Sequence, residues 1–285
     1  MPDTLTTLSE HRCFGGVQGF YSHTSGNIGL PMRFSVFKPP QAQDGPRPAL
    51  IYLAGLTCTE ETFPTKGGAQ RIAAELGLIL VSPDTSPRNA GVPDETQDWD
   101  LGVGAGFYMN ATQLPWSVHY RMEDYVINEI RRIVVTQFGA DVNRLGLFGH
   151  SMGGHGALTL ALRYPGLFKS LSAFAPICAA TQCPWGTKAL SHYLGPDKAA
   201  WQGYDACALI SRAASVPYPA GILVDQGLAD KFLVDQLKPE LLAQACAAAG
   251  QPLTLRHHEG FDHGYYFIQT FMEDHLRFHH QQLTA

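Results

Sequence analysis

Short apolar runs alternate along this chain with longer stretches in which apolar residues recur at every third or fourth position. Runs of the first kind, bounded by glycine, proline or polar residues, are typical of strands. Several of them are almost continuously apolar, as central strands covered on both faces usually are. The predicted strands comprise residues 33–38, 49–54, 78–82, 145–149, 170–175, 221–225 and 253–257.

The stretch 119–138 carries the clearest helical pattern. Its apolar residues are spaced so that they share one face of a helix, namely Met122, Tyr125, Val126, Ile130, Ile133, Val134 and Phe138. The predicted helices comprise residues 68–76, 119–138, 152–163, 232–249 and 263–282. Strands that alternate with helices predict an α/β fold with a central, mostly parallel sheet and right-handed crossovers.

The whole chain, residues 1–285, is expected to form a single domain, because it has no composition break, internal repeat or low-complexity linker. Roughly the first forty residues are expected to add antiparallel strands to the same sheet, with a turn near Ser25, Gly26 and Asn27.

Two stretches fit neither pattern. Residues 82–115 are rich in glycine and proline but also carry Trp99, Phe107 and Tyr108. Long loops in compact domains are usually functional or disordered, and the aromatic residues favour an ordered loop that packs near a functional site. Residues 176–204, which follow a predicted strand, are predicted to be a second loop excursion.

The sequence Gly149-His150-Ser151-Met152-Gly153 lies between a predicted strand and a predicted helix. In that context G-x-S-x-G is the signature of a nucleophile elbow, a turn so tight that the serine hydroxyl stands at its tip. Side chains two residues before and after the serine would collide with the neighbouring strand and helix, and both positions are glycine. The motif therefore predicts an α/β-hydrolase fold and a serine hydrolase with Ser151 as its nucleophile.

Charge and composition narrow the range of partners. The formal net charge of −5 argues against nucleic acid as a partner. Neither a basic run nor an apolar run of about 20 residues points to a membrane, and the polar start 1–7 does not resemble a secretory signal. The cysteines form no C-x-x-C pair, which disfavours a metal site and fits free thiols in a reducing cytoplasm. They are Cys13, Cys58, Cys178, Cys183, Cys207 and Cys246.

A serine nucleophile needs a base within hydrogen-bond reach and a third group that fixes the tautomer of that base. In this fold an Asp or Glu and then a His follow the serine along the chain, beyond the carboxyl ends of later strands. His263 lies in the turn between the last predicted strand and the last predicted helix, which is the position expected of the base. His275 and His279 share a face of that helix, but no H-E-x-x-H motif accompanies them, so no metal site is expected there.

The acid has two candidates in residues 221–230, a predicted strand that runs into a turn. Asp225 ends the strand, where turn amides can occupy its carboxylate, whereas Asp230 lies in the loop and can point toward the strand ends. We therefore prefer Asp230 as the acid and keep Asp225 as the alternative. Asp262 is discounted, because neighbouring side chains in ordinary backbone point away from each other.

The tetrahedral intermediate of acyl transfer carries an oxyanion, which needs preorganised N–H donors. One donor is the backbone N–H of Met152, the residue after the nucleophile, at the start of a helix whose dipole favours negative charge. The second comes from the loop after an early strand, here residues 55–59. Leu56 is the candidate in that loop, and Gly55 allows the backbone to approach closely.

The chain resembles the S-formylglutathione hydrolase family, also called esterase D. The segments that carry the resemblance span nearly the whole chain in the family's order, and they are residues 53–59 (LAGLTCT), 104–108 (GAGFY), 149–157 (GHSMGGHGA), 225–230 (DQGLAD), 262–263 (DH) and 265–267 (YYF). The resemblance implies hydrolysis of the thioester S-formylglutathione to glutathione and formate, the last step of formaldehyde detoxification. It also implies a triad of Ser151, Asp230 and His263, without metal or organic cofactor, in a cytoplasmic enzyme that is often a homodimer.

A formyl group is very small, so the acyl pocket is expected to be small, with Trp185 as a candidate wall and ordinary packing as the alternative for this residue. Cys58 is expected beside the site, and the resemblance suggests that such a thiol makes the enzyme sensitive to thiol reagents. The alternative for Cys58 is a small buried filler. Lys66 and Arg88 are basic and lie in early loops, which makes them candidates to hold the glutathione carboxylates, with ordinary surface cations as the alternative.

Two other functions compete with this one. The first is a broad short-chain carboxylesterase or acyltransferase on the same fold, because a pocket seldom rejects close analogues of its substrate strongly. The second is a catalytically inactive binding module. It is disfavoured, because such proteins usually lose a triad residue and all three triad positions are filled here.

Overall fold

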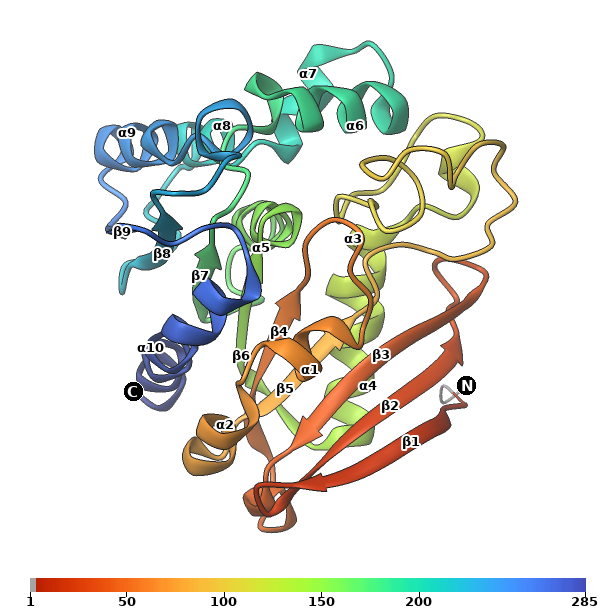
Figure 1. Cartoon of the computed structure of the whole chain (residues 1–285), viewed down its shortest axis with the longest axis vertical. Coiled ribbons are helices and arrows are strands. Elements are labelled where there is room, and N and C mark those ends of the chain that lie inside the picture. The colour runs from red at the N-terminus through yellow and green to blue at the C-terminus, as the bar shows by residue number, and fades with distance from the viewer. Residues whose placement is uncertain (1–3) are drawn as a thin grey trace.

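The computed structural model describes residues 4–285 and contains one nine-stranded sheet (Figure 1). Residues 1–3, part of the polar start from which no secretory signal is expected, lie outside the described residues. The strands follow one another across the sheet in the order β1-β2-β3-β5-β4-β6-β7-β8-β9. Their bounds are β1 (Thr6–Cys13), β2 (Gly16–Thr24), β3 (Pro31–Lys38), β4 (Arg47–Leu53), β5 (Ile79–Pro83), β6 (Ala140–His150), β7 (Ser170–Phe174), β8 (Ile222–Gly227) and β9 (Leu253–His258).

The sheet is parallel from β5 across to β9, whereas β1, β2 and β3 join it in antiparallel fashion. The predicted parallel sheet with antiparallel N-terminal strands is therefore confirmed, and every strand predicted by its range is present. The turn between β2 and β3 begins at Ser25, whose carbonyl accepts the N–H of Gly29 at 2.9 Å. β1 lies at the sheet edge, and its mostly exposed residues lack the apolar run on which strand prediction rests.

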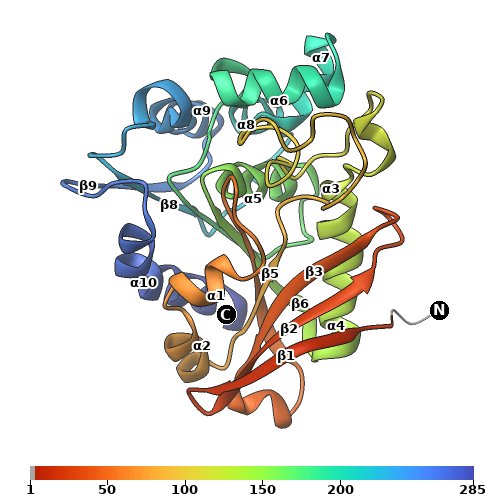
Figure 2. The same ribbon diagram turned by 45° about the vertical axis from the view of Figure 1, so that its right-hand side comes forward.

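Helices cover both faces of the sheet. In Figures 1 and 2, α2 and α10 lie on one face, while α4 and α5 lie on the other. The helical elements are α1 (Thr62–Lys66), α2 (Gln70–Leu76), α3 (Met122–Asp124), η3 (Tyr125–Ile130), α4 (Arg131–Phe138), α5 (Met152–Arg163), α6 (Pro184–Leu194), α7 (Lys198–Trp201), α8 (Ala206–Arg212), η6 (Leu233–Leu237), α9 (Pro239–Ala249) and α10 (Tyr265–Thr284). Single 3₁₀ turns are η1 (Pro40–Gln43), η2 (Trp116–Val118), η4 (Ala180–Gln182) and η5 (Gln202–Tyr204).

Within residues 4–285, none of the helices combines the length and the apolar character that a bilayer crossing requires.

The predicted helix 232–249 is interrupted. It consists of η6 and α9, which meet at Lys238, a residue with φ of 52° in the left-handed region. Proline disfavours the right-handed helical conformation of the residue that precedes it, and Pro239 therefore ends one helix and begins the next.

The prediction of a loop at residues 176–204 is wrong. This segment contains α6 and α7, which lie above the carboxyl ends of the strands in Figure 1. Pro184 is the first residue of α6, and the sulfur of Cys183 accepts the N–H of Gly186. Proline and cysteine here form the start of a helix, although a proline at this place in the sequence is equally typical of a loop. Residues 84–115, by contrast, form neither a helix nor a strand, as predicted for most of that loop.

The centre of the sheet is fully buried and supports the site at its carboxyl edge. Tyr52 of β4 and Phe148 of β6 have no exposed surface, and the ring of Tyr52 stacks on that of Phe63 with centroids 3.9 Å apart. Close packing of this kind holds the ends of β4 and β6 in fixed positions.

Candidate active site

Ser151 stands in the turn between β6 and α5. Its backbone has φ of 58° and ψ of −120°, a conformation that residues other than glycine rarely adopt. A Cβ atom at Gly153 would lie 1.9 Å from the carbonyl oxygen of Leu53, and one at Gly149 would lie 2.3 Å from that of Gly153. The turn therefore requires both glycines, which agrees with the steric argument drawn from the motif.

Asp230 and His263 form a hydrogen-bonded pair. The distance from His263 Nδ1 to Asp230 Oδ2 is 2.5 Å, and an ionised carboxylate can only accept, so Nδ1 is the donor. The carboxylate of Asp230 also accepts the backbone N–H of Phe232 at 2.8 Å and the side-chain amide of Gln226 at 3.3 Å. The buried carboxylate thus fixes the ring of His263 and leaves its Nε2 as the nitrogen available to a substrate or a serine.

Asp225 has different surroundings. Its two oxygens accept from the guanidinium of Arg256 at 2.6 and 2.5 Å, and each oxygen lies 3.3 Å from a histidine, His258 or His275. Burial by itself would raise the pKa of Asp225, but the hydrogen bonds and charges of His275 and Arg256 outweigh it and hold the pKa well below its usual range. Asp225 therefore links β8 to β9 and α10 through its side chain. Because Arg256, His258 and His275 occupy its oxygens, the carboxylate is not available to His263.

Ser151 and His263 line one small pocket, whose volume is about 130 Å³. The other residues of this catalytic pocket are Gly55, Leu56, Cys58, Trp99, His150, Trp185, Phe232 and Tyr265. Trp185 of α6 meets Trp99 edge to face with ring centroids 5.4 Å apart, and it meets Phe232 at 4.7 Å. The structure thus brings Trp185 and Cys58 to the same pocket as Ser151, and the aromatic loop of residues 82–115 reaches that pocket through Trp99.

The backbone N–H groups of Leu56 and Met152, the candidate oxyanion donors, have no hydrogen-bond acceptor within residues 4–285. The loop that carries Leu56 is nevertheless held firmly. The N–H of Thr57 donates to the carbonyl of Gly104 at 2.9 Å, and Thr85 Oγ1 donates to the carbonyl of Cys58 at 2.6 Å. Two fixed N–H donors without acceptors beside the serine are what an oxyanion hole requires.

Arg88 supports the same loop. Its guanidinium donates to the carbonyl of Cys58 at 3.1 Å and forms two hydrogen bonds to the carboxylate of Asp84, at 2.6 and 3.0 Å. Because these partners occupy the guanidinium, the structure does not support Arg88 as a residue that binds the glutathione carboxylates.

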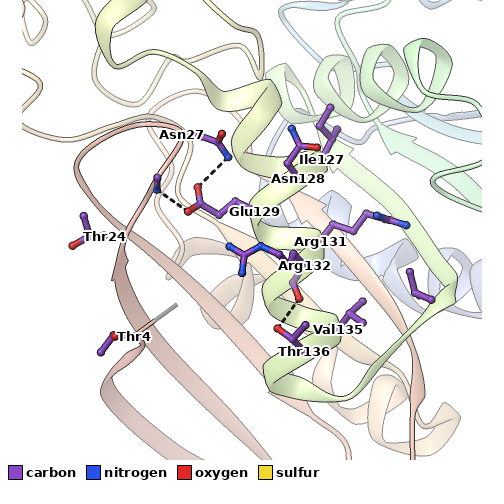
Figure 3. A pocket seen from close by; sticks show the side chains of 12 residues that line it. Thr4, Thr24, Asn27, Ile127, Asn128, Glu129, Arg131, Arg132, Val135 and Thr136 are labelled. Carbon is purple, nitrogen blue, oxygen red and sulfur yellow. Dashed lines mark hydrogen bonds between the residues drawn. The ribbon is translucent and has the colours of Figure 1, made fainter. Parts of the chain in front are cut away.

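A larger pocket of about 940 Å³ lies between the turn after β2 and the helix formed by η3 and α4 (Figure 3). The carboxylate of Glu129 faces Asn27 across it, and it accepts the side-chain amide of Asn27 at 3.3 Å and the N–H of Gly26 at 2.8 Å. None of Ser151, Asp230 and His263 lines this pocket, so its size does not make it the site of hydrolysis.

Comparisons with known proteins identify the family. Residues 25–278 match the model of an esterase family described as "Putative esterase". The S-formylglutathione hydrolase of Mus musculus is 48% identical over 282 residues, which cover 99% of this chain and 99% of that protein. The solved S-formylglutathione hydrolase of Agrobacterium tumefaciens has a TM-score of 0.94 and 49% identity, over 98% of this chain and 99% of that chain. The chain belongs to the S-formylglutathione hydrolase family of esterases.

Membership in the S-formylglutathione hydrolase family makes this chain an ester or thioester hydrolase with the predicted α/β-hydrolase fold. A more distant likeness shows the fold alone. A fluorophosphonate-binding serine hydrolase of Staphylococcus aureus has a TM-score of 0.75 at 19% identity, over 93% of this chain and 98% of that chain.

Three further residues line the catalytic pocket, namely His150, Phe232 and Tyr265. The sequence alone assigned no role to any of them. His150 directly precedes Ser151 in the elbow, and its ring centroid lies 4.4 Å from that of His263. Burial, reinforced by the charge of His263, holds the pKa of His150 well below its usual range, so this ring is neutral beside the base. Phe232 follows Asp230 by two residues, and Tyr265 follows His263 by two. This closeness to the triad along the chain could have indicated that both residues lie at the site.

Proposed function

We propose that this enzyme hydrolyses S-formylglutathione to glutathione and formate through a formyl-enzyme on Ser151, and that this is the last step of formaldehyde detoxification. The small catalytic pocket carries the proposal. Its volume is about 130 Å³, whereas pockets that enclose a drug-sized ligand measure about 300–1,000 Å³. Such a pocket suits a one-carbon acyl group and its sulfur. Two S-formylglutathione hydrolases at nearly half identity support the same substrate.

The proposed acylation uses the three triad residues in separate roles. His263 Nε2 removes the proton of Ser151 Oγ as that oxygen attacks the formyl carbon, and the carboxylate of Asp230 stabilises the resulting imidazolium through Nδ1. The N–H groups of Leu56 and Met152 hold the oxyanion. When the carbon–sulfur bond breaks, His263 returns the proton to the departing glutathione sulfur.

Deacylation repeats these steps with water. His263 removes a proton from a water molecule, the hydroxide attacks the formyl group on Ser151, and formate leaves as the proton returns to Ser151 Oγ. Ser151 Oγ makes no hydrogen bond within the described residues, and the bond to His263 is expected to form in the substrate complex, as catalytic hydrogen bonds often do.

A cytoplasmic homodimer belongs to the same proposal. The cysteines form no disulfide among residues 4–285, which supports a reducing compartment. Sedimentation velocity at micromolar concentration tests the dimer, and a species of monomer mass alone would contradict it.

The decisive experiment measures kcat/KM for S-formylglutathione and for 4-nitrophenyl acetate, with Ser151→Ala as the control. A large preference for the thioester that disappears in Ser151→Ala is the expected result. Equal or weaker use of the thioester, still dependent on Ser151, would instead indicate a broad short-chain carboxylesterase. A fluorophosphonate probe that fails to label Ser151 would indicate an inactive binding module.

A further inference from the structure

The catalytic pocket has no space for a tripeptide, so the glutathione part of the proposed substrate must lie outside it. A second pocket of about 580 Å³ shares the wall residue Tyr265 with the catalytic pocket. It lies between the end of α1 and the turn that carries His263 into α10. Its other lining residues are Pro64, Thr65, Lys66, Gly68, Gln70, Asp262, Gly264, Tyr266 and Gln269.

This second pocket presents one positive and one negative side chain. Lys66 is exposed at the last residue of α1 and forms no ion pair within residues 4–285. Asp262 is also exposed, and its Oδ1 accepts the N–H of Gly264 at 2.8 Å, while its other oxygen has no hydrogen bond within the described residues. Both charges are therefore available to a ligand.

Other cations near the catalytic pocket are already engaged. Lys188 lies between the carboxylates of Asp98 and Asp100, at 2.8 and 2.6 Å. Lys231 stands over the ring of Phe232, with its nitrogen 4.9 Å from the ring centroid. The charge of Lys66 also acts on the thiol of Cys58, a residue of the catalytic pocket, which agrees with the closeness of the two pockets.

We propose that the second pocket binds the γ-glutamyl end of glutathione, with Lys66 donating to its α-carboxylate and Asp262 accepting from its α-ammonium group. A zwitterionic amino acid head matches a lysine and an aspartate that face one pocket. Tyr266, which is 86% exposed, supplies an aromatic surface at the same place. The γ-glutamyl arm extends about 7 Å from the cysteine, the length of two extended residues, which suits two pockets that share a wall.

The inference rests on the proposed function, and its test uses two thioesters of equal net charge. S-Formylglutathione and S-formyl-N-acetylcysteinylglycine both carry a net charge of −1 near neutral pH, but only the first has the γ-glutamyl head. Their kcat/KM ratio is measured for the wild-type enzyme and for Lys66→Ala, Lys66→Glu and Asp262→Asn. Lys169→Glu is the matched control, because this exposed lysine precedes β7 at the amino edge of the sheet, opposite the site.

In the wild-type enzyme the ratio should favour S-formylglutathione. Lys66→Ala should reduce the ratio about tenfold, mainly through KM, because a hydrogen bond to a charged group is lost. Lys66→Glu should reduce it further, Asp262→Asn should reduce it about threefold to tenfold, and Lys169→Glu should leave it unchanged. The equal charge of the two substrates removes any general effect of the altered surface potential from the ratio.

A ratio that stays within twofold of wild type in Lys66→Glu, in an enzyme that still hydrolyses S-formylglutathione, overturns this inference and leaves the proposed function intact. A wild-type enzyme that prefers 4-nitrophenyl acetate to S-formylglutathione overturns the proposed function, and this inference with it. The two failures are therefore seen in different measurements.

Discussion

Two aspartates five residues apart, Asp225 within β8 and Asp230 in the loop after it, have opposite chemical surroundings. Asp225 is fully buried and neutralised by Arg256, whereas Asp230 directs one oxygen to His263 and is otherwise held by amide groups. An uncompensated carboxylate can stabilise an imidazolium during catalysis, and a carboxylate already paired with a guanidinium does this poorly. The role of each aspartate therefore follows from its hydrogen-bond partners and not from its position along the chain.

Replacing the two aspartates should have different consequences. Asp230→Asn should keep the fold but reduce kcat by about 10⁴-fold, because the amide no longer selects the tautomer and charge of His263. Asp225→Asn should lower the free energy of unfolding by about 2 kcal/mol, because Arg256 and His275 lose a buried, charged acceptor, while kcat stays within tenfold. Steady-state kinetics and urea unfolding check both. A wild-type kcat in Asp230→Asn together with a large loss in Asp225→Asn would reverse the assignment.

Cys58 lies in the catalytic pocket, yet burial raises the pKa of its thiol, partly offset by hydrogen bonds with Thr62 and Tyr265. We predict that Cys58→Ser keeps kcat within tenfold of wild type and becomes resistant to N-ethylmaleimide, which should inactivate the wild-type enzyme by filling the pocket. Residual esterase activity after timed exposure to the reagent measures this. Loss of activity in Cys58→Ser as complete as in Ser151→Ala would show a direct catalytic role instead.

At the scale of elements, the elbow between β6 and α5 packs the start of α5 against the end of β4. Gly153 touches the backbone of Leu53, and the loop that carries Leu56 begins two residues after Leu53. The two candidate oxyanion donors, one on α5 and one on this loop, therefore have their separation set by the closeness of Gly153 to β4.

The variant Gly153→Ala tests this coupling. The added Cβ would lie 1.9 Å from the carbonyl oxygen of Leu53, so β4 and α5 must move apart. We expect a loss of about 3 kcal/mol in the free energy of unfolding and about 10²-fold in kcat, because both oxyanion donors are displaced. The control is Gly26→Ala, whose Cβ has its nearest neighbour 3.9 Å away. Unchanged kinetics in Gly153→Ala would disprove the coupling.

At the scale of the whole molecule, buried histidines make stability depend on pH. His155 of α5 has no exposed surface, and burial lowers its pKa to about 4, with the charge of Asp205 opposing that shift. Burial also holds the pKa of His279 well below its usual range. These rings are neutral in the folded protein, whereas the unfolded chain binds protons below about pH 6.5.

We therefore predict that stability is greatest above about pH 6.5 and falls as the pH drops toward 4. His155 alone should contribute a loss of about 3 kcal/mol over that range, because the unfolded state gains a proton that the folded state rejects. Urea unfolding at several pH values between 7.5 and 4.5 measures how steeply the free energy of unfolding falls with pH. His155→Leu should flatten it, and the exposed control His192→Leu should leave it as in wild type. Equal slopes in wild type and His155→Leu would refute the assignment.

Local patterns determined much of this protein. The strand-forming runs, the elbow around Ser151 and the turn that carries His263 could be predicted because periodicity, glycine placement and chain order act over a few residues. The interrupted helix at Lys238 and the helix α6 were predicted wrongly, because the local signals of Pro239 and Pro184 are compatible with either a loop or a helix start.

Only the tertiary structure decided which distant segments meet. Trp99, Trp185 and Phe232 come from three separate parts of the chain and together form a wall beside Ser151. The contact of His150 with His263 likewise depends on the packing of β6 beside the turn after β9. The physical reason is that such contacts depend on how whole elements pack, a property that no pattern of neighbouring residues carries.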